Sequence, residues 1–399
     1  MSSGAANSSM HLVSIANAKL APKRLSIVIL GLSIRSSWGN GHATTYRALV
    51  RALAARGHRV LFLERDMPWY ARAVDMPKPI GARLEVYGSL QELSSRFTRA
   101  IRNADLVIVG SYTPEGKAVG EWVLRNASGV KAFYDIDTPV TLRGLGHDKV
   151  EYLNIKLLRS YDLYLSFTGG PFLSYLEAKG ARMVRPLYCS ADVNCYFPEP
   201  ESYRWDLGYM GTYSADRAAA MEQLLLKPAQ LLPDARMVVA GPQYPADMVW
   251  HSNIERFEHL APGEHRAFFC AQRFTLNLTR EPMKRAGYSP SVRLFEAAAC
   301  GCAIISDWWP GLDSLFVPGR EILIARDQQD VVRYLTRLPE RRRDLVASRA
   351  RVRVLSEHTA EKRVLQLEEY LAEIGSNSQI SGLQPTSTLE RSADARNRL

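Results

Sequence analysis

The chain of 399 residues has five cysteines and no apolar run of about 18 residues or more. A helix needs a run of that length to cross a bilayer, so no membrane-spanning helix is predicted. Five residues separate Cys189 from Cys195, and one separates Cys300 from Cys302. Neither spacing joins a second cluster as zinc ligands do, so we predict no metal site and five reduced, mostly buried thiols. No secretory signal is recognised at the start, and we expect a cytoplasmic protein.

A dinucleotide-binding fingerprint is also missing. The first predicted βαβ unit contains Gly31, Gly39 and Gly41, whose spacing does not make G-x-G-x-x-G. Glu64, at the end of the second strand, is the residue that would hold the ribose of a nicotinamide dinucleotide. An NAD(P)-dependent oxidoreductase remains an alternative, against which the missing glycines argue.

The composition, 46% hydrophobic and 23% charged, is that of a soluble globular protein, and the length predicts two domains. The net charge is +10, and eight arginines fall between Arg333 and Arg353 against Glu340 and Asp344. On a helix they would form a basic face, which is either solvated or in peripheral contact with the anionic inner face of a membrane. The series of aromatic residues that stacks bases is lacking, so nucleic acid is not predicted as a partner.

Apolar runs of strand length alternate with segments of helical period through most of the chain. In the first half, seven such runs cover 25–31, 59–64, 83–89, 104–111, 130–137, 162–168 and 181–188, and a helix is predicted at 42–56. A second series begins near residue 207, in which helices are predicted from Arg217 and at 265–272 and a strand at 321–327. We therefore predict an α/β protein of two doubly wound Rossmann-like domains that face each other across a cleft. Ligands of such sheets bind beyond the carboxyl ends of the strands.

Breaks in this pattern predict the domain boundaries. The predicted segments are a mobile leader at 1–23, an N-terminal domain at 24–188, a linker at 189–204, a C-terminal domain at 205–356, a C-terminal helix at 357–375 and a disordered tail at 376–399.

The stretch SPSVRLFEAAACGCAIISD, residues 289–307, predicts a loop, a short helix and a buried strand. The first backbone N–H groups of such a helix bind anions, and Ser289 and Ser291 stand in the loop before it. Glu296 follows about one turn later, where a carboxylate can accept hydrogen bonds from a ribose diol. The combination suits a nucleotide diphosphate, and an ordinary α/β crossover is the alternative interpretation.

Four stretches resemble the GT-B glycosyltransferases, within them glycosyltransferase family 4 and most closely its CgeB-like (spore maturation protein) branch. They are GNGHATTYRALVRALAARGHRV at 39–60, CSADVNCYFPEP at 189–200, YMGTYSADRAAAMEQLL at 209–225 and the long stretch at 276–324 that contains SPSVRLFEAAACG. The resemblance implies a hexosyltransferase-type enzyme with a nucleotide diphosphate-sugar in the C-terminal domain and an acceptor in the N-terminal one. The nucleotide sugar is a co-substrate and no other cofactor is implied. The acceptor, whether glycan, lipid-linked, protein or small molecule, stays open.

The resemblance also implies which residues bind the donor. Glu296 matches the glutamate that holds the donor ribose, and the diphosphate loop corresponds to Ser289, Pro290, Ser291 and Val292. The phosphate-facing turn after the first strand of the donor domain corresponds to Gly211, Thr212 and Arg217, and the acceptor-side loop to Gly39 and Gly41. Family 4 enzymes hold the donor sugar with another glutamate eight positions before the ribose-binding one, where this chain has Tyr288. Because of this departure, the resemblance predicts neither the sugar nor the stereochemical outcome.

Physical reasoning places cations and a base in the same cleft. A departing diphosphate carries negative charge, which cations and N–H groups stabilise without a metal. The candidate cations are Arg217, Arg280, Lys284, Arg285 and Arg293. An acceptor hydroxyl needs a base, and the titratable residues that follow predicted strands are His42, Asp135 and Asp137. Each of these has a structural alternative as a helix-start, turn or cap residue. A non-catalytic nucleotide-sugar-binding or scaffold protein and a sugar-nucleotide epimerase of the same fold are the further alternatives.

Overall fold

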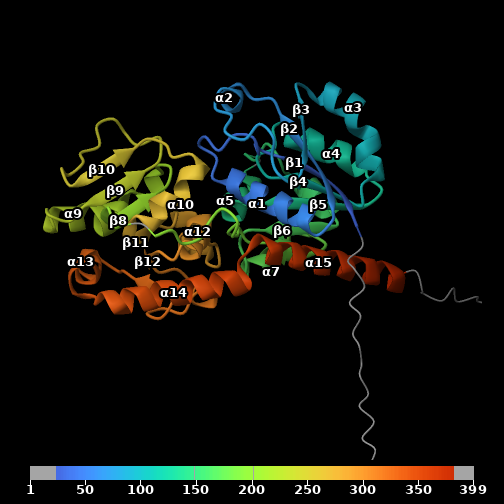
Figure 1. Cartoon of the computed structure of the whole chain (residues 1–399). Coiled ribbons are helices and arrows are strands. Elements are labelled where there is room, and N and C mark those ends of the chain that lie inside the picture. The colour runs from blue at the N-terminus through green and yellow to red at the C-terminus, as the bar shows by residue number, and fades with distance from the viewer. Residues whose placement is uncertain (1–23, 148, 201, 382–399) are drawn as a thin grey trace, which may run out of the picture.

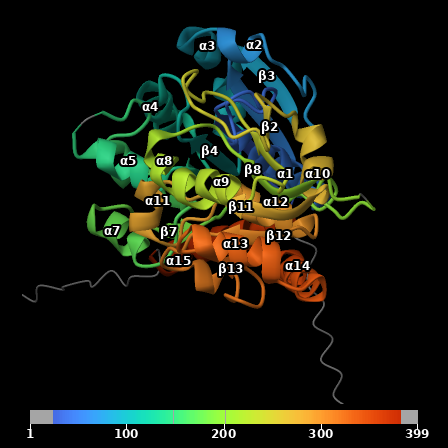
Figure 2. The ribbon, with the colours of Figure 1, turned by 90° about the vertical axis from the view of Figure 1, so that its left-hand side faces the viewer.

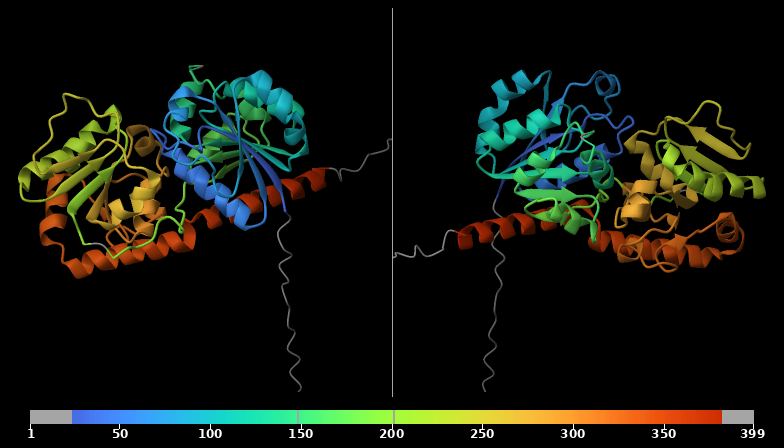
Figure 3. Two further views of the ribbon diagram at one scale, coloured as in Figure 1. Left: turned by 45° about the horizontal axis from the view of Figure 1, so that its top comes forward. Right: turned by 180° about the vertical axis from the view of Figure 1, so that it is seen from behind.

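The computed structural model describes residues 24–147, 149–200 and 202–381, which form two parallel β-sheets covered by helices (Figure 1). Each sheet belongs to its own domain. In Figure 2 the C-terminal domain stands in front of the N-terminal one, and Figure 3 shows the two domains side by side. The predicted fold class, α/β with two doubly wound Rossmann-like domains, is confirmed. The expected leader at 1–23 and most of the expected tail, 382–399, lie outside the described residues.

The N-terminal sheet has seven strands in the order β3-β2-β1-β4-β5-β6-β7. Its strands are β1 Ser26–Gly31, β2 Arg59–Arg65, β3 Arg83–Tyr87, β4 Leu106–Gly110, β5 Val130–Asp135, β6 Leu163–Ser166 and β7 Val184–Pro186. Its helices are α1 His42–Ala55, α2 Pro68–Ala71, α3 Leu90–Asn103, α4 Gly116–Asn126, α5 Thr138–Leu145, α6 Ile155–Ser160 and α7 Phe172–Ala178. The strand order reverses between β1 and β4, which leaves a crevice beyond the carboxyl ends of these strands.

The C-terminal sheet has six strands in the order β10-β9-β8-β11-β12-β13. Its strands are β8 Trp205–Met210, β9 Met237–Ala240, β10 Ile254–Phe257, β11 Gln272–Asn277, β12 Ala303–Ser306 and β13 Leu323–Ile324. Its helical elements are η1 Ala215–Arg217, α8 Ala218–Met221, η2 Glu222–Leu226, α9 Lys227–Leu231, α10 Pro262–Cys270, α11 Glu281–Ala286, α12 Val292–Ala299, η3 Leu312–Ser314, α13 Gln328–Arg337 and α14 Glu340–Glu357. The order reverses between β8 and β11, so this domain opens a second crevice, opposite the first.

The last helix, α15 Ala360–Ser381, returns to the N-terminal domain (Figure 1). Glu368 on this helix pairs with Arg56 at 2.5 Å and with His58 at 2.8 Å, just beyond the end of α1. The chain therefore crosses between the domains twice, and an isolated bridge joins Ala191 to Thr359 where the crossings meet. The helix continues to Ser381, past residue 375, where its end was expected.

Three elements differ from the predicted pattern. The helix expected at 265–272 is α10, which ends at Cys270 because Gln272 already belongs to β11. The helix expected from Arg217 is divided, with a π-helical stretch just before Pro228, a residue that has no N–H to donate to the regular ladder. The strand expected at 321–327 is reduced to β13.

Candidate functional site

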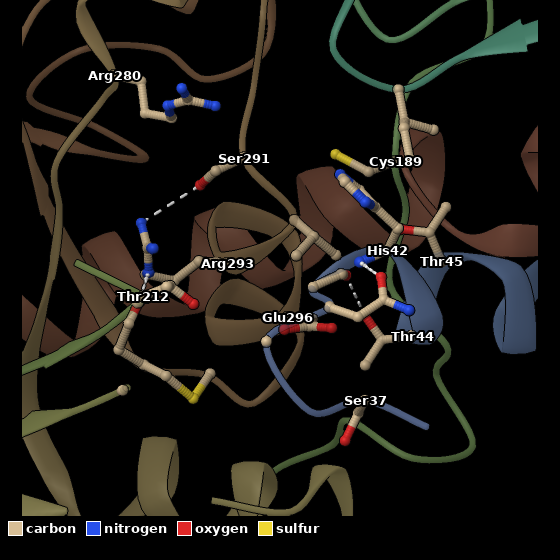
Figure 4. A pocket seen from close by; sticks show the side chains of 18 of the residues that line it. Ser37, His42, Thr44, Thr45, Cys189, Thr212, Arg280, Ser291, Arg293 and Glu296 are labelled. Atoms are coloured by element: carbon tan, nitrogen blue, oxygen red, sulfur yellow. Dashed lines mark hydrogen bonds between the residues drawn. The ribbon is translucent and has the colours of Figure 1, made fainter. Parts of the chain in front are cut away.

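A cavity of about 390 Å³ lies between the two domains, where the carboxyl ends of the two sheets face each other (Figure 4). The predicted site residues that line it are Gly39, Gly41, His42 and Asp137 from the N-terminal domain, and Gly211, Thr212, Arg217, Arg280, Ser289, Pro290, Ser291, Val292, Arg293 and Glu296 from the C-terminal domain. Asp135 and Tyr288, which were also predicted, are absent from the lining. Residues from 74 positions apart (Asp137 and Gly211) to 257 positions apart (Gly39 and Glu296) thus meet in one place.

The loop before α12 presents an uncapped helix start to the cavity. Ser291 is the N-cap residue of α12, but its side chain makes no cap hydrogen bond. Its hydroxyl instead donates to Asn277 Oδ1 at 2.8 Å, and the hydroxyls of Ser289 and Thr168 lie 2.9 Å apart. The first turn of α12 also carries no acidic residue. Its N–H groups are therefore available to an anion, as a phosphate site requires.

Arg293 supplies a buried positive charge behind this loop. Its Nη1 donates to Asn277 Oδ1 at 2.8 Å, its Nε donates to the carbonyl of Met210, and its guanidinium carbon lies 4.9 Å from the centroid of the Tyr209 ring. Burial lowers the pKa of Arg293. A Cβ at position 211 would lie 2.8 Å from Arg293 Nη2, so Gly211 lets the backbone approach this cation closely.

Glu296 lies in the second turn of α12, between Arg293 and Thr44 of α1 (Figure 4). The residue is 2% exposed, and its Oε1 is buried without a hydrogen-bond partner among the described residues. Burial raises its pKa to about 7, although the neighbouring Tyr196, Thr44 and Arg293 favour the charged form. An unpartnered buried carboxylate oxygen is energetically unfavourable, and a hydroxyl donor from a ligand would satisfy it.

Two further arginines reach the cavity from the C-terminal domain. Arg217 donates from Nη2 to the carbonyl of Thr212 at 2.5 Å. Arg280 Nε donates to Asp216 Oδ2 at 3.1 Å, and its Nη1 lies 3.8 Å from Asp137 Oδ2 in the other domain. The remaining candidate cations are directed elsewhere: Lys284 pairs with Asp307 and Arg285 with Glu281.

His42 stands at the start of α1 on the opposite wall. Its Nδ1 is buried and has no hydrogen-bond partner within the part of the chain that the structure describes. Its ring stacks on Tyr112 at 6.1 Å and meets the edge of Phe167 at 6.4 Å, measured between ring centroids. Burial lowers the pKa of His42, and the nearby Asp137 only partly opposes this. The imidazole is therefore neutral near pH 7, with a free nitrogen beside the cavity.

The two predicted aspartates have different surroundings. Asp137 lines the cavity, and its Oδ2 accepts a hydrogen bond from the Tyr112 hydroxyl at 2.9 Å. Asp135 is fully buried below it, where it accepts hydrogen bonds from Tyr164 and, at 2.9 Å, from Thr141. Burial raises the pKa of Asp135 to about 6. Its carboxylate stabilises the turn that carries Asp137 and does not line the cavity.

Tyr288 also lies outside the cavity. Its backbone is left-handed, with φ of 47°, and its N–H donates to the carbonyl of Pro310 at 2.7 Å. The ring fills the space between Gly170 and Gly311, because a Cβ at either glycine would lie 2.4 Å from it. Tyr288, eight positions before Glu296, therefore contacts both domains. It gives the cavity no carboxylate in place of the glutamate that family 4 enzymes have at this position.

Among the groups that the sequence analysis missed are His265, which lines the cavity, and Tyr196, which adjoins Glu296. Tyr196, in the interdomain linker, has its hydroxyl 3.1 Å from His265 Nδ1, and His265 Nε2 lies 3.2 Å from the carbonyl of Leu260. His265 lines the cavity, and burial lowers its pKa to about 4. Leu260 follows β10, so the rule that ligands meet the carboxyl ends of strands could have found that loop. No sequence signal pointed to Tyr196.

Other expectations concern the whole chain. In the described ranges, no group of three or more His, Cys, Asp or Glu side chains is arranged to hold a metal ion. None of the described helices is both long and apolar enough to cross a membrane. The five cysteines form no disulfide, and all except Cys195 are buried.

The arginine-rich stretch at 333–353 spans α13 and α14, and part of its charge is already neutralised. Arg343 is buried and pairs with Glu340 and Asp344, and Arg353 pairs with Glu321. The exposed members without an ion-pair partner among the described residues are Arg337, Arg341 and Arg342.

Comparison with known proteins agrees with this architecture. Residues 217–369 match a family described as "Glycosyl transferase-like". A sucrose-phosphate synthase from Thermosynechococcus elongatus is similar over 89% of this chain and 100% of that chain, with a TM-score of 0.63 and 14% identity. The Anabaena protein HepE, solved in complex with UDP and glucose, is similar over 88% of this chain and 100% of that chain, with a TM-score of 0.65 and 15% identity. No curated protein sequence matches the chain.

At these identities, the structural likeness establishes the GT-B fold and leaves the CgeB-like branch a prediction. The matched family region contains the loop before α12, together with Arg293 and Glu296. The cavity residues from Arg217 onward therefore lie within the region that matches the "Glycosyl transferase-like" family, whereas Gly211 and Thr212 precede it.

Proposed function

We propose that this protein is a glycosyltransferase that moves a hexose from a uridine diphosphate-sugar to an acceptor hydroxyl. The observation that carries the proposal is the buried Glu296 carboxylate, with Oε1 unpartnered, one turn beyond the uncapped start of α12. A nucleotide diphosphate offers a phosphate to the helix start and a ribose diol to the carboxylate. The choice of uridine is supported by HepE, a protein of the same fold that was solved with UDP.

The cations around the helix start fit the charge of a departing diphosphate. As the glycosyl–phosphate bond breaks, negative charge collects on the phosphate oxygens. Arg217, Arg280 and Arg293 approach the cavity from three directions and stabilise that charge together with the N–H groups of α12. We propose that they do so without a divalent metal, and that transfer therefore continues in the presence of EDTA.

His42 is the proposed base on the acceptor side. Its imidazole is neutral, and the unpartnered Nδ1 can accept the proton of an acceptor hydroxyl. The hydroxyl oxygen then bonds to the anomeric carbon, the bond from that carbon to the phosphate oxygen breaks, and the diphosphate leaves with the electron pair. The nearby Asp137 stabilises the imidazolium that results, as a carboxylate beside a catalytic histidine does.

A single displacement of this kind inverts the anomeric centre. Retention by two displacements would need a free carboxylate nucleophile in the cavity. Position 288 provides none, and Asp135 is buried away from the cavity. Glu296 is assigned to the ribose, and Asp137 accepts a hydrogen bond from Tyr112 and is assigned to His42. We therefore include inversion in the proposal.

Nucleotide binding tests the proposal first. The purified protein is screened by thermal shift against UDP, GDP, dTDP, ADP and NADPH. A ligand at a hundredfold excess over its Kd stabilises the folded state by about 2.7 kcal/mol, so a UDP shift is readily measured. A shift with NADPH alone would favour an oxidoreductase. The absence of a shift with every nucleotide would contradict the proposed donor site.

Product analysis then separates the remaining functions. Incubation with a UDP-sugar and water as the acceptor should release UDP and free sugar slowly. An epimerase would return an isomeric UDP-sugar without UDP. Tight UDP-sugar binding with no release, in water or with any acceptor tested, would identify a non-catalytic binding protein.

A further inference from the structure

An exposed apolar surface borders the N-terminal wall of the cavity. Four large apolar residues form it, and we call them the apolar rim: Trp38 is 42% exposed, Trp69 50%, Val74 38% and Ile80 61%. Three of them fall in the segment 66–80 that follows β2 and contains α2, and Trp38 lies in the loop that follows β1. Two half-exposed tryptophans on neighbouring segments are a concentration of apolar surface that soluble proteins use for interaction.

Among the residues that the structure describes, the acidic residues of this surface are paired, whereas two of its basic residues are not. Its two acids are already paired: Asp66 lies 2.5 Å from Arg35, and Asp75 lies 2.7 Å from Arg47. Arg72 and Lys78 are exposed and have no ion-pair partner anywhere in the described ranges. The apolar rim is therefore flanked by free positive charge, and an anionic partner complements it.

Hydrogen bonds tie the apolar rim to the cavity wall. Ser37, which lines the cavity, donates from its N–H and its hydroxyl to the Asp75 carboxylate at 3.1 and 2.7 Å. Ser36 Oγ donates to the carbonyl of Ala73 at 2.7 Å, and the N–H of Met76 donates to the carbonyl of Arg35 at 3.0 Å. The loop that forms one side of the cavity and the segment that carries the apolar rim are thus one unit.

We propose that the apolar rim docks on an anionic bilayer, and that the acceptor is a membrane-anchored molecule whose head group enters the cavity beside His42. Tryptophan favours the bilayer interface because its ring is apolar and its N–H is polar, and each nearby lysine or arginine adds attraction to anionic lipid. The part of the proposal that concerns the acceptor rests on the proposed glycosyltransferase function. The docking of the apolar rim on a bilayer does not depend on that function.

A second basic surface competes for the same role. Arg341 and Arg342 on α14 are exposed beside Leu345 and Val352, which are 47% and 65% exposed. In Figures 1 and 2, α2 lies on the upper side of the molecule and α14 on the lower side, so one flat membrane cannot contact both. We favour the apolar rim because it adjoins the acceptor side of the cavity, which α14 does not line.

Vesicle flotation of the full chain tests the proposal. The protein is mixed with vesicles of phosphatidylglycerol and phosphatidylcholine, or of phosphatidylcholine alone, at low and high salt. The wild type should float with the anionic vesicles, and high salt should weaken the binding. The double variant Trp69→Ser/Ile80→Ser should lose at least tenfold in affinity. Arg72→Glu/Lys78→Glu should lose roughly fivefold or more for each cation removed, and only with anionic vesicles.

Matched controls carry the same changes elsewhere. Val249→Ser and Leu231→Ser remove exposed apolar residues from the C-terminal domain, and should float as the wild type does. Arg341→Glu/Arg342→Glu probes the α14 surface. Loss of flotation in this variant, with none in the variants of the apolar rim, would overturn the proposal in favour of α14.

The UDP shift is measured for every variant, so folding and the donor site are monitored separately. A protein that binds UDP but floats with no vesicle would overturn the docking proposal and leave the proposed function intact. A protein that floats but binds no nucleotide would contradict the function and leave docking standing. Concentration-dependent dimers that Trp69→Ser/Ile80→Ser abolishes, without flotation, would show that a second copy covers the apolar rim.

Discussion

Arg280 Nη1 lies 3.8 Å from Asp137 Oδ2, which brings a cation of one domain and an anion of the other together across the cavity. Arg280 is also bonded to Asp216 in its own domain, so its charge is shared between two carboxylates. A diphosphate is a stronger partner than either, and its arrival should draw Arg280 from Asp137. The contact would then both hold the domains together before binding and release Asp137 to the acceptor side.

Replacement of Arg280 by Met should weaken UDP binding by roughly tenfold to a hundredfold, because a hydrogen bond to a charged group contributes about 1.5–3 kcal/mol. Isothermal titration measures the change. Arg285→Met is the matched control, since Arg285 lies on α11, the helix that follows Arg280, is exposed and pairs with Glu281. Equal UDP affinity in the Arg280 and Arg285 variants would show that Arg280 does not bind the diphosphate.

Glu296→Gln should reduce discrimination between UDP and 2′-deoxy-UDP. In the wild type, 2′-deoxy-UDP lacks the hydroxyl that would donate a hydrogen bond to the Glu296 carboxylate. The variant has no carboxylate at this position, so the missing hydroxyl costs it less affinity. We expect roughly tenfold discrimination in the wild type and less than threefold in the variant. Glu281→Gln, on the surface of α11, should behave as the wild type. Discrimination that survives in Glu296→Gln would place the ribose elsewhere.

Glu296 should also make stability depend on pH. Its folded pKa, about 7, lies above the ordinary value of 4.5, so the buried group favours its protonated form. Stability should therefore fall as pH rises from about 4.5 to 7, by about 3 kcal/mol in total, and stay level above that. Urea unfolding across this range should show a smaller fall in Glu296→Gln than in the wild type, because Asp135, whose pKa burial raises to about 6, contributes to the fall in both. UDP favours the ionised carboxylate, so saturating UDP should lower the folded pKa of Glu296 and make its part of the fall smaller.

His42→Gln should lower the rate of UDP-sugar hydrolysis by about 10²–10⁴ and leave UDP affinity within about twofold. Burial lowers the pKa of His42, so wild-type activity should persist below pH 6.5 and fall only when the imidazole gains a proton at still lower pH. That acid limb should be absent from the residual activity of the variant. His147→Gln changes an exposed histidine and should have no effect. An unchanged acid limb in His42→Gln would assign the base to another group.

Tyr288→Glu should not create a sugar-binding carboxylate. The ring fits between Gly170 and Gly311, and its loss should destabilise the protein by about 2 kcal/mol, or several degrees in Tm. Tyr288→Phe keeps the ring and should unfold near the wild-type temperature. The anomeric configuration of the product, followed by NMR from the start of the reaction, should be inverted in the wild type and in both variants. A retained product in the wild type would contradict the single displacement at His42.

Much of the architecture was predictable because its physical causes are local. Strands such as β4 are buried on both faces, and this forces an unbroken apolar run that can be read in the sequence. Glycine positions and the length of each crossover then require parallel pairing. The start of α12 and the place of Glu296 on this helix were predictable for a similar reason, since both lie within one short loop–helix–strand unit.

Which side chains reach the cavity was not predictable from the sequence alone. Asp135 and Asp137 look equivalent after β5, yet packing against Tyr164 and Thr141 buries the first and leaves the second beside Arg280. Tyr288 was expected at the donor sugar, yet two glycines, one from each domain, hold its ring at the interface. Contacts with other elements of the fold decide both cases: Tyr164 lies 29 positions from Asp135, and Gly170 lies 118 positions from Tyr288. No local pattern records these contacts.

The two Rossmann-like domains and the helix that carries Glu296 could be predicted from the amino-acid sequence, because hydrophobic period and helix-end chemistry act over a few neighbouring residues. Packing between distant segments, in contrast, places Thr44 of the other domain and Tyr196 beside Glu296 and leaves His42 with an unpartnered nitrogen at the opposite wall. The reason is that burial, which sets these pKa values and leaves these polar atoms unpaired, arises only when the two domains close around the same cavity.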